Sequence, residues 1–264
     1  MDDSTDWRAG IDPSAANSAR MYDYYLGGKD HFPADIAAAR KVIALQPNVR
    51  PAARENRHFL RRAVTYLTQE AGIQQFLDIG AGLPTAGNVH EIAPEARVVY
   101  VDHDPVVITQ ARALLGGSDR VRVVMGDVRD PDAILEHPSV CRFLDFDEPL
   151  ALLLVGLLHF VQDREGAYGV VARLRDALPS GSFAAISHGM SEGFDKGLVN
   201  NISNVYSSQM SHQLRTRAQV EPFLTGLDLV EPGLVPITEW RPDGISEGLT
   251  AREVGIIGAV GRVP

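Results

Sequence analysis

FLDIGAGLP, residues 76–84, is the stretch that decides the fold of this chain. Its first four residues have strand character, and they lead into two closely spaced glycines, Gly80 and Gly82. A helical pattern follows, from about Thr85 to Ile92. Glycine is required where a ligand approaches the backbone closely or where φ is positive, and the start of the next helix offers unpaired N–H groups. The turn therefore predicts a ligand site, although many α/β proteins also end a strand in Gly-x-Gly for structural reasons alone.

Strand and helix patterns alternate after this turn. We expect strands at residues 97–101, 121–125, 150–155 and 182–187, and helices at residues 104–115, 131–135, 165–178 and 218–224. Two last strands are expected at residues 227–240 and 254–260. Because strands that alternate with helices form a parallel sheet covered on both faces, the pattern predicts the α/β class.

The N-terminal part of the chain has a different, helical texture. Residues 1–17 are polar and lack periodicity, so we expect a loose tail there. Helices are predicted from Ala19 to Leu26, from Pro33 to Leu45 and from Pro51 to Ala71. We therefore expect a tail and a helical cap over residues 1–72, followed by one continuous core over residues 73–264.

Composition argues against several classes of protein and site. The chain has 264 residues, of which 45% are hydrophobic, and its formal net charge of −9 argues against sequence-independent binding of nucleic acids. The one cysteine, Cys141, cannot form an internal disulfide or a cysteine-based zinc site, and we expect it to be buried. The histidines match no metal-binding motif. The polar N-terminus does not resemble a signal peptide, and the apolar run at residues 150–160 is too short to span a bilayer, so we expect a cytoplasmic protein.

Two carboxylates are expected at successive strand ends. Asp102 stands 24 positions after Asp78, close to the spacing of an acid that accepts hydrogen bonds from ribose hydroxyls. Asp127 follows the next strand. In open α/β sheets the carboxyl ends of the strands line the ligand crevice, so both acids and the glycine turn are expected around one cavity. Asp104 stands directly before Pro105, and we interpret it as a helix cap instead.

Residues 76–187 resemble the class I methyltransferases that depend on S-adenosylmethionine. Their first motif is an acidic residue followed by Gly-x-Gly, matched here by Asp78, Gly80 and Gly82. LPSG at residues 178–181 resembles the family's Leu-x-Pro-Gly-Gly turn, and LLHF at residues 157–160 resembles its pattern on the substrate side. The resemblance implies a Rossmann-like fold with a mostly parallel sheet of seven strands and helices on both faces.

The same resemblance implies where the cofactor, S-adenosylmethionine, would bind. Its methionine part would lie near the glycine turn, and its ribose hydroxyls on Asp102. Its adenine would lie near His103, Asp127 and Val128.

Two N-terminal strings resemble a narrower family. ARMYDYYLGGKD at residues 19–30 and ARENR at residues 53–57 are similar to the actinobacterial S-adenosyl methyltransferases, which were first grouped as a domain of unknown function. This resemblance covers nearly the whole chain. His31 stands where that family would have asparagine, so no role is carried over to it.

His159 and His188 are the candidate catalytic residues. They follow the fourth and fifth predicted strands, and histidine titrates near neutral pH, which suits a general base. A base is needed only if the methyl acceptor is protonated, and either histidine could instead be a hydrogen-bonded structural residue.

Two groups of side chains on the N-terminal helices could also reach the cofactor. Tyr22, Tyr24 and Tyr25 form either a lid over the sulfonium or an ordinary helix-packing face. Four arginines at helical spacing form either an anion-binding stripe or a solvated face: Arg50, Arg54, Arg57 and Arg61. Tyr22 and Arg57 lie in the two family-like strings, and we take both as candidates for cofactor binding.

The sequence thus predicts a methyltransferase that acts on an unidentified small molecule and releases S-adenosylhomocysteine. A nicotinamide-dependent oxidoreductase would share the turn and the acid of the second strand, but the third glycine of its fingerprint would fall at Thr85. A non-catalytic regulator that binds S-adenosylmethionine would use the same binding residues and stays open. The sequence does not indicate the oligomeric state.

Overall fold

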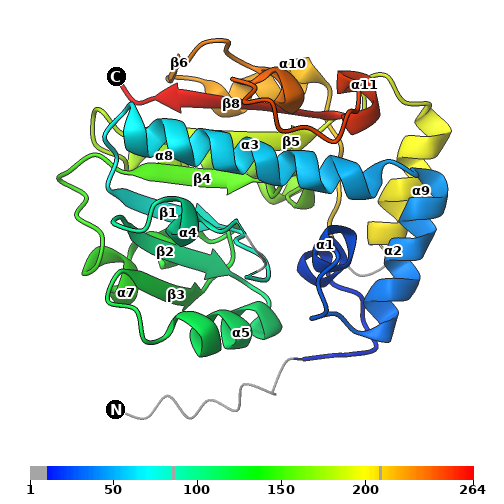
Figure 1. Ribbon diagram of the computed structural model, residues 1–264, viewed down its shortest axis with the longest axis horizontal. Coiled ribbons are helices and arrows are strands. Elements are labelled where there is room, and N and C mark those ends of the chain that lie inside the picture. The colour runs from blue at the N-terminus through cyan, green and yellow to red at the C-terminus, as the bar shows by residue number, and fades with distance from the viewer. Residues whose placement is uncertain (1–10, 85–86, 208–209) are drawn as a thin grey trace.

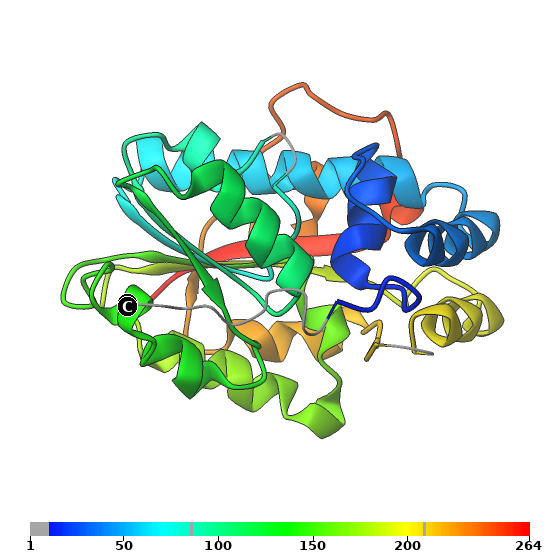
Figure 2. The ribbon, with the colours of Figure 1, turned by 90° about the horizontal axis from the view of Figure 1, so that it is seen from below.

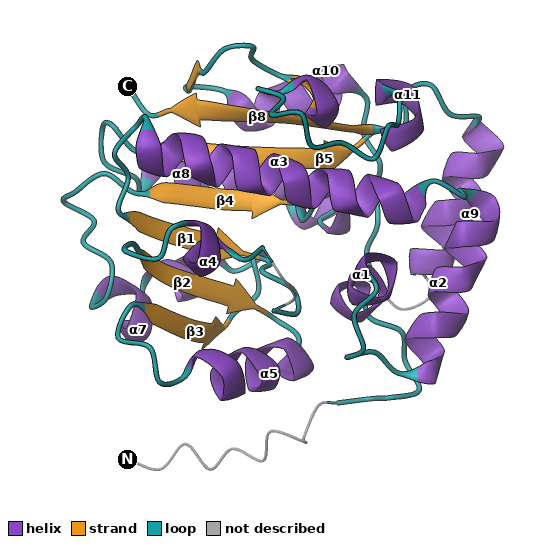
Figure 3. Ribbon diagram, viewed as in Figure 1, coloured by secondary structure: helices purple, strands orange, loops and turns teal. Residues whose placement is uncertain are grey.

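An eight-stranded sheet forms the centre of the computed structural model, which describes residues 11–84, 87–207 and 210–264 (Figures 1 and 3). Its strands are β1 (Gln75–Ile79), β2 (Arg97–Asp102), β3 (Val121–Met125), β4 (Ala151–Val155), β5 (Phe183–Gly189), β6 (Asp228–Leu229), β7 (Val235–Pro236) and β8 (Ile256–Arg262). Strands β1 to β5 are parallel, and β8 is antiparallel to β5. The predicted α/β class is confirmed, with one short strand more than the seven expected.

The direction in which strands are added reverses between β1 and β4. The order across the sheet is β3-β2-β1-β4-β5-β8-β6, with β7 also paired to β8. The chain therefore moves outward from β1 to β3 and then returns to the other side of β1. Ligands of such sheets bind outside the carboxyl ends of the strands at this reversal. The glycine turn at residues 80–82 follows β1 and lies at that point.

Helices cover both faces of the sheet and its carboxyl edge. They are α1 (Ser18–Leu26), α2 (Pro33–Leu45), α3 (Val49–Gln69), α4 (Val89–Ile92), α5 (Pro105–Leu115), α6 (Pro131–Leu135), α7 (Pro138–Cys141), α8 (Ala167–Asp176), α9 (Lys196–Ser207), α10 (Arg217–Val220) and α11 (Ala251–Val254). Helices α3, α4 and α5 lie on one face, and α6, α7 and α8 on the other (Figure 2). Within the described ranges, no helix combines the length and apolar character needed to cross a membrane.

Helix α3 crosses one face of the sheet and joins the N-terminal segment to the core. Five of its apolar side chains are buried: Phe59, Leu60, Ala63, Val64 and Leu67. These side chains pack against Phe76 of β1, Val98 of β2 and Leu153 of β4. Burial of one large apolar side chain contributes about 1.5–3 kcal/mol, so these residues fix α3 firmly on the strands whose ends form the site.

Helices α1, α2 and α9 pack together beyond the carboxyl ends of the strands (Figure 1). Met21 and Tyr25 of α1, Val42 of α2, and Ile202 and Tyr206 of α9 belong to their shared apolar cluster. The hydroxyls of Tyr25 and Tyr206 are hydrogen-bonded to each other at 3.0 Å. Two segments far apart in the sequence thus meet over one edge of the sheet.

The string at residues 19–30 folds around Asp23. Gly27 ends α1 with φ +87°, and Gly28 lies so close to Asp23 that a Cβ there would overlap the carboxyl group. Oδ2 of Asp23 accepts a hydrogen bond from the N–H of Asp30 and lies 3.0 Å from Nδ1 of His31. The unusual composition of this string is therefore explained by the turn that leads from α1 to α2.

The segment at residues 227–240 differs from the single strand expected there. It contains two strands of two residues each, β6 and β7, with Pro232 and Gly233 between them. Pro232 has no N–H for a strand ladder, and Gly233 has φ +84°, so the extended chain is interrupted. The segment ends at Trp240, which is fully buried against α3.

Three smaller expectations also change. Cys141 is exposed rather than buried, because its neighbour Val140 points into the core from the short helix α7. The helix expected from Thr85 is described from Val89 onward, and Thr85 itself lies outside the described residues. The tail is described from residue 11. Its last residue, Asn17, is held in place, because its N–H donates to Oδ1 of Asp35 in α2 at 2.8 Å.

Candidate functional site

A cavity of about 210 Å³ lies at the carboxyl edge of the sheet, between the strand ends and helices α1, α2 and α9. Most of the predicted site residues line it: Tyr22, Arg57, Asp78, Gly80, Gly82, Asp102, His103, His159 and His188. Asp127 and Val128 are not part of this lining. The structure thus brings the glycine turn, the acid of β2 and both candidate bases around one space.

The glycine turn is held by the end of β2. The N–H of Gly80 donates to the carbonyl oxygen of Val101 at 2.8 Å, and the N–H of Gly82 donates to Oδ2 of Asp102 at 2.9 Å. Gly80 has φ +75° and Gly82 has φ +68°. A Cβ at Gly80 would lie 2.6 Å from Cδ1 of Leu157. Both the backbone conformation and the space at Gly80 therefore require glycine.

Asp102 is buried at the end of β2 and bonded to two loops. Its Oδ1 accepts a hydrogen bond of 2.9 Å from the N–H of Asp104, and its Oδ2 accepts the bond from Gly82. Burial raises the pKa of Asp102, and these two N–H groups oppose the rise. Each carboxylate oxygen keeps a second lone pair for a ligand hydroxyl. Asp104 caps α5 through Val106, as predicted.

Asp78 and Arg57 both line the cavity, and their charges interact. Burial raises the pKa of Asp78 to about 7, against the opposing charge of Arg57. Arg57 Nη2 donates to the carbonyl oxygen of Gly87 at 3.0 Å and to Oδ1 of Asn88 at 3.1 Å. Arg57 therefore reaches the segment beyond the glycine turn while its charge acts on the cavity.

The other members of the arginine stripe have structural contacts. Arg54 forms an ion pair with Glu247 at 2.7 Å, and Arg61 pairs with Asp243. Arg50 donates to a backbone carbonyl of α1 at 3.3 Å. Arg54 and Arg61 fix the polar loop after Trp240 against α3, so of the four predicted arginines Arg57 is the one that lines the cavity.

Two of the three tyrosines of α1 line the cavity, and the third does not. Tyr22 and Tyr25 line the cavity, whereas Tyr24 packs against His31 with ring centroids 5.1 Å apart. The hydroxyl of Tyr22 donates to the carbonyl oxygen of Ala53 at 2.9 Å, which ties α1 to α3. Tyr22 therefore presents its ring to the cavity with its hydroxyl already bonded.

Asp127 does not line the cavity, and its carboxylate is engaged elsewhere. It forms an ion pair with Arg129 at 2.6 Å. Although partial burial acts to raise it, the pKa of Asp127 is lowered by the hydrogen bonds from Arg129 and also by His103. His103 lines the cavity, whereas Asp127 does not. The side chain of Val128 belongs to the apolar core instead.

His188 is hydrogen-bonded at both ring nitrogens. Its Nε2 lies 2.8 Å from Nη1 of Arg215, and its Nδ1 lies 2.7 Å from the carbonyl oxygen of Gly189. Arginine can only donate, so Nε2 accepts and the ring proton is on Nδ1. Burial lowers the pKa of His188 to about 3, and the charge of Arg215 acts in the same direction. His188 is therefore a neutral imidazole without a free lone pair.

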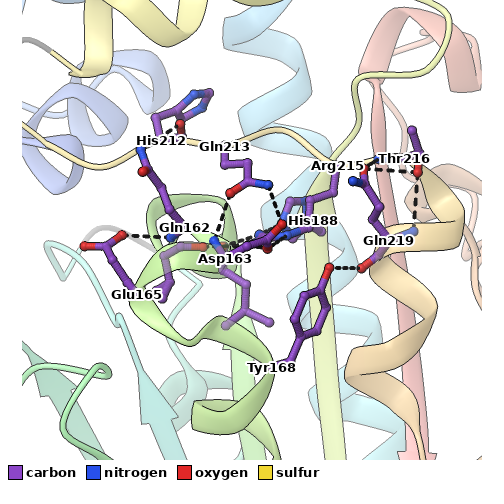
Figure 4. Close-up of polar contacts among 12 residues, drawn as sticks. Gln162, Asp163, Glu165, Tyr168, His188, His212, Gln213, Arg215, Thr216 and Gln219 are labelled. Carbon is purple, nitrogen blue, oxygen red and sulfur yellow. Dashed lines mark hydrogen bonds and ion pairs between the residues drawn. The ribbon is translucent and has the colours of Figure 1, made fainter.

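Arg215 is fully buried behind His188 and has several acceptors (Figure 4). It donates to the carbonyl oxygens of Leu158 and Val161 at 2.9 and 2.8 Å, and to Oδ1 of Asp163 at 2.7 Å. These contacts join the loop after β4 to the segment between α9 and α10. They also fix the side of the cavity on which both candidate bases lie.

His159 differs from His188 because its Nδ1 is buried and has no hydrogen-bond partner within the described residues. Its ring lies 5.6 Å from that of His188 and 5.8 Å from that of His212. Burial lowers the pKa of His159 well below its usual value, and His188, His212 and Arg215 add to the effect. The imidazole of His159 is therefore neutral, and the residue lines the cavity while its Nδ1 is buried.

Several residues of the site are not predicted from the sequence. Asn56 accepts a hydrogen bond from the hydroxyl of Ser187 at 2.7 Å and donates to Tyr22 at 3.3 Å, so it links α1, α3 and β5. It lies inside the ARENR string at residues 53–57, and that string could have marked it as a site residue. Helix α9 supplies Ile202 and Tyr206, whose spacing of four fits one helix face. No pattern in the sequence marks Arg215 as a residue of the site.

A protein family described as S-adenosyl methyltransferase matches residues 4–264. A solved structure of a DUF574 family protein from Streptomyces avermitilis is 43% identical, with a TM-score of 0.90, and the match covers 96% of this chain and 99% of that one. A protein from Thermobifida fusca, provisionally described as a methyltransferase, is 41% identical with a TM-score of 0.90 over 96% and 97% of the two chains.

A more distant structure shares the fold alone. The N-methyltransferase NodS from Bradyrhizobium japonicum, solved in complex with S-adenosylhomocysteine, is 14% identical with a TM-score of 0.51, over 81% of this chain and 88% of that one. No curated protein gave a significant match.

Proposed function

Because this chain belongs to the S-adenosyl methyltransferase family, we propose that it transfers a methyl group to a small molecule bound in the cavity beneath α1, α2 and α9. The cofactor of the family is S-adenosylmethionine. When bound, it supplies an electrophilic methyl carbon on a cationic sulfonium. The protein then has mainly to align the acceptor atom with that carbon, and alignment of this kind can lower a barrier by roughly 7–11 kcal/mol.

The residues of the cavity fit this cofactor in charge. Burial holds Asp78 partly protonated near neutral pH, and a cationic ligand would stabilise its charged form. Arg57, on the same side, suits the carboxylate of the methionine part. The ring of Tyr22 faces the cavity, and aromatic faces attract sulfonium as they attract other cations. We therefore assign the methionine part to Asp78, Arg57, Tyr22 and the glycine turn.

The adenosine part is assigned to the end of β2. Asp102 keeps a free lone pair on each oxygen after its two backbone bonds, which suits two adjacent ribose hydroxyls. His103 lines the cavity beside it and would contact the adenine. Asp127 and Val128 do not line the cavity, and a contact from Asp127 would require its carboxylate to leave Arg129.

His159 is the better candidate for a general base. A base needs a free lone pair within reach of the acceptor. His159 lines the cavity and its imidazole has no hydrogen bond among the described residues, whereas both nitrogens of His188 are bonded. We propose that His188 and Arg215 are positioning residues that hold the loop carrying His159. Removal of the imidazole of His159 would slow transfer to a protonated acceptor by about 10²–10⁴-fold.

The hydrogen bond from Gly82 to Asp102 is the observation that carries the cofactor assignment, because it joins the two expected cofactor motifs at the cavity wall. Calorimetric titration with S-adenosylmethionine and with NAD tests it. We expect binding of the former, at least tenfold weaker in Asp102→Ala, and no heat from NAD. Tight NAD binding would reject the proposal, and unchanged affinity in Asp102→Ala would reject the ribose assignment.

Turnover is tested with methyl-labelled S-adenosylmethionine and extracts of an organism that encodes this chain. Transfer of the label to a small molecule is the expected result. A bound cofactor that never becomes S-adenosylhomocysteine in any extract would instead favour a regulator that binds without catalysis.

A further inference from the structure

The cavity has two unlike halves, which follow from the strand order. The ends of β1 and β2 form one side, and the ends of β4 and β5 form the other. On the first side lie the charged residues Arg57, Asp78 and Asp102. The second side, which we call the apolar half, is walled by Val42, Phe160, Met190, Val199, Ile202 and Tyr206.

The apolar half offers no partner for a charged molecule among the described lining residues. All the Asp, Glu, Lys and Arg side chains that line the cavity belong to the first side. The guanidinium of Arg215 lies behind His188 and is already bonded to Asp163 and to two carbonyl oxygens. Because an unpaired charge is costly to move out of water, this half selects against both anionic and cationic acceptors.

The histidines of this half are neutral as well. His188 has its proton on Nδ1 and accepts from Arg215 through Nε2. Burial lowers the pKa of His212 to about 4, and burial also lowers that of His159. At neutral pH the three rings are therefore polar but uncharged.

Aromatic rings shape the wall of the apolar half. The ring of Tyr206 stacks on that of His212 at 4.6 Å, and Phe160 lies 5.6 Å from Tyr206. The hydroxyl of Tyr206 is bonded to that of Tyr25, so its polar atom is already satisfied. Rings in such offset and edge-on arrangements favour a flat aromatic guest.

Strand β4 is the neighbour of β1, so His159, which follows β4, lies in the apolar half at its border with the first side. Resting on the proposed function, we propose that the methyl acceptor is an uncharged aromatic alcohol whose ring occupies the apolar half and whose hydroxyl faces His159.

The reaction then balances without changing the net charge of the cavity. The acceptor oxygen forms a bond to the methyl carbon, the carbon–sulfur bond breaks with its electron pair left on sulfur, and the hydroxyl proton passes to the imidazole of His159. The positive charge lost from sulfur reappears on the imidazole. A neutral, buried histidine can accept it because the net charge of the cavity stays the same.

Binding of simple probes tests the class of acceptor without relying on turnover. The full chain is first saturated with S-adenosylhomocysteine and then titrated with 2-naphthol, 2-naphthoate and 2-naphthylmethylammonium. We expect 2-naphthol to bind at least tenfold more tightly than either charged probe. Equal or tighter binding of a charged probe would overturn the inference. Failure to bind S-adenosylhomocysteine would instead count against the proposed function, so the two failures are distinguishable.

Matched variants on α9 locate the binding half. Ile202 is buried in the wall, whereas Asn204 is exposed on the same helix. Ile202→Lys is expected to weaken 2-naphthol at least tenfold, and Asn204→Lys to leave it within twofold. If the lysine variant does not fold, Ile202→Thr is the milder replacement, and it should weaken binding of 2-naphthol about threefold. Retained naphthol affinity in a folded Ile202 variant that still binds S-adenosylhomocysteine would contradict the placement.

The contact to His159 is tested by comparing 2-naphthol with naphthalene, which lacks the hydroxyl. His159→Phe is expected to weaken 2-naphthol about fivefold, in the range of one lost hydrogen bond, and to leave naphthalene unchanged. Equal losses for the two probes would show that His159 has only a packing role.

Discussion

The N–H of Gly82 and Oδ2 of Asp102 lie 2.9 Å apart in a hydrogen bond, so the acid at the end of β2 holds the glycine turn that follows β1. Oδ1 of the same carboxylate holds the loop that leads into α5 through the N–H of Asp104. Asp102 is therefore expected to act twice, as a ligand of the ribose and as a support for the turn beneath the methionine part.

This double role predicts a stability loss in the absence of ligand. Asp102→Ala leaves two buried N–H groups without their acceptor, which costs about 1–3 kcal/mol, measured as the free energy of unfolding in urea. Asp127→Ala is the matched control because its carboxylate pairs with Arg129 at the surface, and it should cost under about 0.5 kcal/mol. It should also weaken S-adenosylmethionine only about threefold. Larger losses of stability and of affinity for S-adenosylmethionine in Asp127→Ala than in Asp102→Ala would contradict the double role of Asp102.

Asp78 should couple cofactor binding to pH. Its folded-state pKa of about 7 is above its usual value of 3.8, so the ligand-free protein takes up a proton on folding, and this contribution to stability is lost as pH rises toward and through 7. A cationic ligand favours the ionised form, so affinity for S-adenosylmethionine should rise up to about tenfold from pH 6 to pH 8. Calorimetry in two buffers of different ionisation enthalpy should detect the released proton. The pH dependence should be reduced in Asp78→Asn, and its full persistence there would exclude Asp78 as the source.

Arg215 is expected to be the most sensitive arginine for stability. It is fully buried and its loss leaves Asp163, His188 and two carbonyl oxygens without their donor, so Arg215→Met should lower the free energy of unfolding by roughly 3–5 kcal/mol. Arg217, two positions later, forms an exposed pair with Glu221 on one helical turn. Arg217→Met should change stability by less than about 0.5 kcal/mol. Comparable urea midpoints for the two variants would mean that the Arg215 network contributes little.

The two glycines of the turn should respond differently to a methyl group. Both have positive φ, so Gly80→Ala and Gly82→Ala should each cost about 1–3 kcal/mol of stability from backbone strain. At Gly80 the added carbon also meets Leu157, whereas at Gly82 nothing lies within 4 Å. Gly80→Ala is therefore expected to be the less stable of the two by thermal unfolding. The opposite order would show that Leu157 moves aside freely.

The parallel part of the fold is predictable because its strands are short apolar runs bounded by turns. Burial on both faces of β1 and β4 leaves an almost unbroken hydrophobic signal, and Gly80 and Asp102 follow such runs directly. The acids and glycines of the site could be placed from the sequence for the same reason, since every strand end of a parallel sheet opens on one edge.

The remaining parts of the fold and of the site could not be predicted, because they depend on contacts between segments that are distant in the sequence. Helix α9 contains three asparagines and two serines, which are weak helix formers, and it is stabilised by packing of Ile202 and Tyr206 on α1 and α2. A fully buried arginine such as Arg215 runs against the usual exposure of charged residues, and its acceptors come from loops about fifty positions away. Pro232 and Gly233 show the opposite case, where local chemistry interrupts a strand that hydrophobicity alone suggested.

The wall built from α1, α2 and α9 separates the two recognition tasks along the chain. Nucleotide recognition is assigned to loops between consecutive strands, whereas acceptor recognition is assigned largely to helices that lie outside the sheet. Homologues could therefore diversify their substrates by exchanging a handful of side chains on these helices and leave the adenosine pocket intact. Efforts to re-engineer the enzyme for other aromatic compounds should begin at Ile202 and Val199.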